Sequence, residues 1–115
     1  MVKEYRLLFA IKAVSLDETA HLVARLLGMS VTLRDGSSGN YATCEGPSAD
    51  YLSIRPRNRN DFPDGIDYKQ YNVQLNALNN RGKNVEKEAR HNHLKRQLIK
   101  LPGFSLTIET ATELK

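Results

Sequence analysis

Short stretches in which apolar and polar residues alternate constrain the fold of this chain more than any other feature. Successive side chains on a strand point to opposite faces of a sheet, so a period of two residues indicates a strand. The segments with this pattern, or with a short apolar run of similar length, are 5–14, 29–34, 41–45, 51–55, 68–78 and 104–108. The sequence therefore predicts about six strands.

Two segments between these strands have the period of a helix instead. From Leu16 to Leu27 apolar residues recur every three or four positions. Ser15 and Glu18 have the spacing of a capping box, and Gly28 is suited to the left-handed conformation that ends many helices. A second helix is expected from about Asn84 to Leu101, where a Pro-Gly pair stops it.

The order of these elements predicts the fold class. Strand, helix, four strands, helix and strand follow one another, and short connections favour antiparallel neighbours with both helices on one side. We therefore predict an α+β fold, with a mainly antiparallel sheet of about six strands and two helices on one face. At 115 residues the chain suits a single domain over 1–115, with a polar loop at about 55–67.

The other face of the sheet is expected to be polar. Along the predicted strand 68–78, apolar residues alternate with a row of amides, which are Gln70, Asn72, Gln74 and Asn76. Such a face is usually wet in an antiparallel sheet. The row is therefore expected to be solvated or to receive a partner.

Positive charge is concentrated in one segment. Between Arg81 and Lys100 seven basic residues face two glutamates, which gives +5, whereas the rest of the chain carries −1. The first half of the second helix also offers only Ala89 as an apolar residue, so we expect its first turns to project from the core or to rest on another chain. This asymmetry favours an acidic partner or a polyanion.

Three arginines at alternate positions enter the polar loop, and they form a second basic group. We predict that this group and part of the basic segment contact a partner. The predicted contact residues are Arg55, Arg57, Arg59, Lys87, Arg90, His91 and Arg96.

The sequence indicates no catalytic residue, metal or cofactor, and thus no enzyme. It contains no Gly-rich phosphate loop, nucleophile elbow or cysteine-histidine metal spacing. His91 and His93 point apart on a helix, and Cys44 lies within a strand as a small buried group. The apolar stretches are too short to cross a bilayer, so we expect a cytoplasmic protein without a membrane partner.

Part of the chain resembles one module of a known enzyme superfamily. The segment Leu26–Pro56, with Leu27-Gly28-Met29, Tyr41-Ala42-Thr43 and Tyr51-Leu52-Ser53-Ile54-Arg55-Pro56, resembles a βαβββ module of the glyoxalase and bleomycin-resistance superfamily. The resemblance implies a small-molecule binder or enzyme with histidine and glutamate metal ligands on the strands. The first strand offers no histidine, so the metal-enzyme function is not carried over.

In size and style the whole chain is similar to small bacterial immunity proteins of contact-dependent growth inhibition and related polymorphic toxin systems. This resemblance implies a stoichiometric protein-binding module that neutralises a cognate toxin, and it identifies no residues. The partner is then a toxin domain with an acidic or polar surface. The alternatives are a nucleic-acid-binding domain that uses the basic segment 81–100 and a glyoxalase-like binder or enzyme.

Overall fold

The computed structural model describes residues 2–37 and 39–114 and contains one sheet and two α-helices. The elements are β1 (Val2–Ile11), α1 (Leu16–Leu27), β2 (Ser30–Gly36), β3 (Gly39–Glu45), β4 (Tyr51–Pro56), β5 (Val73–Asn79), α2 (Asn84–Leu98) and β6 (Phe104–Leu114). The predicted α+β class and the predicted order of elements are confirmed. Within the described ranges, no helix is long and apolar enough to span a membrane.

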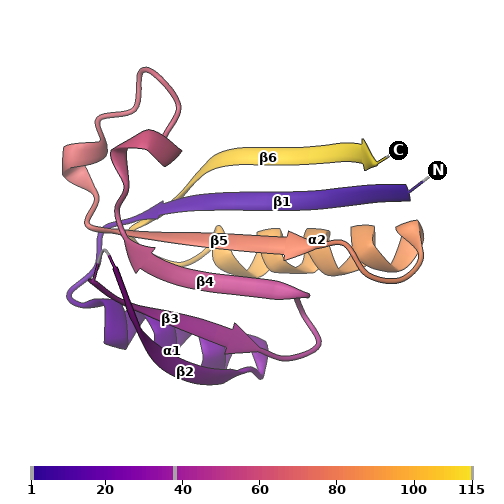
Figure 1. Ribbon diagram of the computed structural model, residues 1–115, viewed down its shortest axis with the longest axis horizontal. Helices are drawn as coiled ribbons and strands as arrows, with labels where there is room; N and C mark the ends of the chain where they lie inside the picture. The colour runs from indigo at the N-terminus through magenta and orange to yellow at the C-terminus, as the bar shows by residue number, and fades with distance from the viewer. Residues whose placement is uncertain (1, 38, 115) are drawn as a thin grey trace.

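All neighbouring strands are antiparallel, in the order β2-β3-β4-β5-β1-β6. Because β1 lies between β5 and β6, these two strands are parallel to each other, and α2 joins them as in a split β-α-β unit. Both helices lie behind the sheet (Figure 1). The opposite side of the sheet, which neither α1 nor α2 covers (Figure 1), is called the open face below.

Local signals account for both ends of α1. The Ser15 hydroxyl accepts a hydrogen bond of 3.0 Å from the backbone N–H of Glu18. Gly28 has φ 66°, and its N–H bonds the carbonyl of Ala24. The predicted bounds of this helix are confirmed, since each end depends on residues close to it in sequence.

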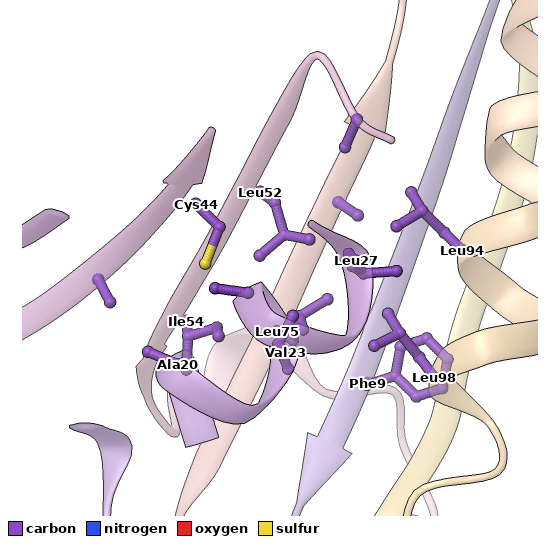
Figure 2. Packing of buried hydrophobic residues seen from close by; sticks show 14 of the residues in the cluster. Phe9, Ala20, Val23, Leu27, Cys44, Leu52, Ile54, Leu75, Leu94 and Leu98 are labelled. Carbon is purple, nitrogen blue, oxygen red and sulfur yellow. The ribbon is translucent and has the colours of Figure 1, made fainter. Parts of the chain in front are cut away.

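The apolar core lies between the sheet and the helices. Figure 2 shows Val23 of α1 and Leu94 and Leu98 of α2 packed over Phe9 and Leu75 of the sheet. Every second residue of the central strands points into this layer, as the alternation predicts.

Cys44 of β3 belongs to the same core. Its side chain is 3% exposed, and burial raises the pKa of the thiol to about 11. The thiol therefore stays protonated near neutral pH. The interpretation of Cys44 as a buried structural residue is confirmed.

The predicted strand from residue 68 is wrong over its first five positions. Tyr68–Gln70 form a 3-10 turn, in which the Asp67 carboxylate accepts from the backbone N–H of Lys69. The side chain of Asn72 then bonds both the N–H and the carbonyl of Ala13, at 2.9 and 2.8 Å. These local bonds compete with a strand ladder, so β5 begins only at Val73.

The amide row is not uniformly solvated. Gln74 is 1% exposed, because Asn58 and Asp61 of the segment that follows β4 lie against its side chain. Its side chain accepts from the N–H of Asn58 at 2.8 Å and donates to the Asp61 carboxylate at 2.7 Å. Asn76 is half-buried, while Gln70 and Asn72 lie outside the strand. The first residues of the predicted polar loop are therefore held against β5 by hydrogen bonds to Gln74.

The first half of α2 does not project from the core. Lys87 is 1% exposed and His91 is 4% exposed, although the sequence offers no apolar stripe there. The Lys87 ammonium donates to the carbonyl of Lys3 at 2.6 Å, and His91 Nε2 lies 2.7 Å from Glu109 Oε2. The long stem of a lysine covers apolar surface when its charged end finds a partner. The prediction that these turns project from the core is therefore wrong, because Lys87 and His91 attach them to the sheet.

Candidate binding site on the open face

Arg55 is held in place by two tyrosines of the open face. Residues 51, 53 and 55 of β4 share this face, opposite the buried Leu52 and Ile54. The Arg55 guanidinium lies 4.0 Å from the ring centroid of Tyr41 on β3, and its Nη2 donates to Tyr51 Oη at 3.1 Å. Arg55 Nε also donates to the Ser53 hydroxyl at 3.4 Å. These three contacts hold the guanidinium in one position before any partner binds.

Gly36 at the end of β2 makes room for the Tyr41 ring. A Cβ atom built at Gly36 would lie 3.0 Å from the Gly39 carbonyl oxygen and 3.1 Å from the ring of Tyr41. Any larger residue would therefore press on the ring over which Arg55 lies. This glycine is a part of the site because of close packing, and its backbone conformation is not left-handed.

The hydroxyl of Tyr51 is made more acidic by its neighbours. Burial raises the pKa of Tyr51, but the hydrogen bond from Arg55, the neighbouring Ser53 and the charges of Arg55 and Arg34 outweigh burial. The pKa of this phenol is therefore below its ordinary value. Tyr51 is 41% exposed, and its oxygen already accepts from Arg55, so its own proton can be donated to a partner.

Arg57 and Arg59 lie beside Arg55 on the segment that follows β4. Arg57 Nη1 donates to the carbonyls of Tyr68 and Tyr71 at 3.2 and 3.0 Å. The guanidinium groups of Arg57 and Arg59 lie 5.3 and 5.5 Å from the centroid of the Tyr68 ring. The structure thus brings the three predicted arginines together.

These arginines line a hollow of about 530 Å³ between the β2–β3 hairpin and the segment after β4. We call it the arginine hollow. Its other lining residues are Gly36, Ser37, Gly39, Tyr41, Pro56, Asn58, Asp61 and Gln74.

The three arginines differ from their neighbours in having no acidic partner. Among the described residues no carboxylate lies within 4.0 Å of Arg55, Arg57 or Arg59. In contrast, Arg6 lies 2.9 Å from Glu4, and Arg34 lies 3.9 Å from Glu45. The arginine hollow therefore carries positive charge that no described carboxylate within 4.0 Å compensates.

The four predicted contact residues of α2 do not join this group. Arg90 is committed to the fold by bonds to Asp50, Asn79 and the carbonyl of Arg81, and Arg96 is exposed on the helix behind the sheet. Lys87 and His91 are buried. Contact between a partner and these last two side chains does not fit the structure.

Sequence reasoning missed Tyr41, Tyr51 and Gly36. The alternation places Tyr51 opposite the core side of its strand, which is a signal for an exposed aromatic residue. The pairing of Tyr41 with Arg55, however, depends on the neighbouring positions of β3 and β4 in the sheet. One strand pattern alone does not carry that information.

Within residues 2–37 and 39–114, no three histidine, cysteine, aspartate or glutamate side chains are placed to hold a metal ion. Comparison of the chain with protein-family models and with curated proteins found no match.

Proposed function

We propose that this chain is a stoichiometric protein-binding module that docks its partner on the open face of the sheet. The observation that supports this most directly is the Arg55 side chain held between Tyr41 and Tyr51. Tyrosine and arginine are enriched among the residues that dominate binding energy in protein interfaces. Side chains that are ordered before binding also lose less entropy when the partner arrives.

The unpaired charge of the arginine hollow favours an acidic partner surface. Charge complementarity speeds association and disfavours wrong partners. A toxin domain with an acidic or polar surface fits this requirement. We therefore propose, more specifically, that the chain is a cytoplasmic immunity protein that neutralises a cognate toxin by covering its active site or substrate surface.

A nucleic-acid partner is less well supported by the same geometry. It would draw on the three arginines together with the basic segment 81–100, but α2 lies behind the sheet, away from the open face (Figure 1). Arginines also lie over the rings of Tyr41 and Tyr68. Base stacking requires accessible ring faces.

The test is co-expression of the chain with the toxin domain encoded immediately upstream of it. We expect an equimolar complex and protection of growth. The double variant Tyr51→Ala/Arg55→Ala should weaken the complex by about 2 kcal/mol or more, roughly 30-fold. Arg25→Ala, an exposed arginine on α1 behind the sheet, is the control and should bind as the wild type does. A toxin neighbour that neither binds nor is neutralised would refute the proposal.

A further inference from the structure

We infer that the arginine hollow receives the paired carboxylates of an acidic segment of the partner protein. This inference rests on the proposed function, because it names the chemistry by which the partner is recognised. The partner segment would carry two or more aspartate or glutamate side chains close together. They would enter between the β2–β3 hairpin and the segment that follows β4.

The first support is the charge balance of the hollow. Three guanidinium groups line it, and Asp61 is the one carboxylate among its described lining residues. Asp61 already accepts a hydrogen bond of 2.7 Å from the buried Gln74. The hollow therefore keeps an excess of two positive charges, which two carboxylates would neutralise.

The second support is the number of N–H donors left over. Each arginine has five N–H donors arranged as a fork that matches a carboxylate. Arg55 uses Nε and Nη2, and Arg57 uses Nη1 for two carbonyls. For Arg59 the described part of the chain provides a ring contact and no hydrogen bond to its guanidinium. Most donors of the three groups therefore remain for a ligand.

The third support is the state of the aromatic rings beside the hollow, which favours carboxylates over a nucleic acid. A single strand binds by stacking its bases on accessible ring faces along a basic path. Beside the hollow the Arg55 guanidinium lies 4.0 Å from the centroid of the Tyr41 ring, and those of Arg57 and Arg59 lie 5.3 and 5.5 Å from the centroid of the Tyr68 ring. The guanidinium groups thus occupy ring faces that bases would use, whereas their free N–H donors suit carboxylates.

The experiment measures binding of a hexa-aspartate peptide to the full chain by calorimetry and by amide NMR shifts. We expect binding that weakens with salt, with shifts concentrated at the hairpin tip and at residues 55–61. The triple variant Arg55→Gln/Arg57→Gln/Arg59→Gln should lose affinity by about tenfold or more. The control Arg25→Gln/Lys83→Gln/Lys100→Gln removes three positive charges from exposed positions elsewhere. It should bind the peptide with the affinity of the wild type.

A single substitution keeps the test decisive if the triple variant fails to fold. Arg59→Gln removes a guanidinium without a hydrogen bond in the described structure, so it should fold and still bind several-fold more weakly. Unchanged binding by this variant would overturn the inference, as would equal binding of a hexa-asparagine peptide. Tighter binding of a single-stranded oligonucleotide at the same residues would assign the hollow to phosphate instead. None of these readouts needs the toxin, so failure of the proposed function would be seen separately, in the co-expression experiment.

Discussion

The carboxylate of Asp50 lies 3.2 Å from the guanidinium of Arg90, and this pair joins the residue just before β4 to the middle of α2. The same Asp50 oxygen accepts from the backbone N–H groups of Asn80 and Arg81, each at 2.7 Å. Arg90 donates in addition to the Asn79 side chain and to the Arg81 carbonyl. This network holds the β5–α2 turn against the sheet, and it explains why Arg90 is a structural residue.

Removal of the Arg90 side chain should destabilise the fold. Arg90→Ala leaves Asp50, Asn79 and the Arg81 carbonyl without this donor, so we expect the free energy of unfolding in urea to fall by about 1–3 kcal/mol. Arg96→Ala, exposed on the same helix, should change it by no more than about 0.5 kcal/mol. Equal stability of the two variants would contradict a structural role for Arg90.

Asp50 should also make stability depend on pH in the acidic range. Burial raises the pKa of its carboxyl, but the backbone N–H groups of Arg81 and Asn80 and the Arg90 guanidinium outweigh burial and hold the pKa below its ordinary value. The folded state therefore binds this proton less readily than the unfolded state does. Its contribution is complete above the unfolded pKa of about 4 and is lost as pH falls through the folded pKa.

This sign is checked by comparing Asp50→Asn with the wild type across pH. We expect the difference in unfolding free energy to be constant between about pH 5 and 7 and to shrink below about pH 4. Thermal or urea unfolding at several pH values measures it. A difference that grows on acidification would show that Asp50 is not stabilised as a carboxylate.

Lys87 tests whether a buried cation holds α2 against β1. Its ammonium is buried and donates to the Lys3 carbonyl, so Lys87→Glu would place a carboxylate against an acceptor oxygen. We expect a loss of about 3 kcal/mol or more, or failure to fold. Lys83→Glu makes the same charge change at an exposed position one turn earlier and should be tolerated. Circular dichroism and urea unfolding distinguish the two variants.

The acidity of Tyr51 is open to direct titration. Because Arg55, Ser53 and Arg34 hold the pKa of Tyr51 below its ordinary value despite burial, this phenol should ionise at a lower pH than an ordinary tyrosine does. Phenolate absorbance against pH should show this low-pH step, and Tyr51→Phe should abolish it. Arg55→Gln should move the step to higher pH, whereas Tyr68→Phe should leave it in place. If the low-pH step persists in Tyr51→Phe, it belongs to another tyrosine and the prediction is wrong.

The order of strands and helices was predictable because its signals are local. Alternation assigns residues to a strand, and Ser15 and Gly28 define the ends of α1 through bonds to nearby backbone groups. The same locality explains the error at 68–72, where alternation continued into a turn held by Asp67 and Asn72. A periodic pattern does not report side-chain bonds that replace the ladder.

The sequence by itself determined the α+β class, the core-facing residues of most strands and the grouping of Arg55, Arg57 and Arg59 on one segment. Only the tertiary structure decided which charged side chains are accessible. Lys87 is buried because its stem covers the sheet and its ammonium reaches the Lys3 carbonyl, 84 residues away in sequence. Arg55 is ordered because the sheet places Tyr41 of β3 beside it. Such contacts depend on strand order and packing between distant segments, so hydrophobicity and charge along the chain do not specify them.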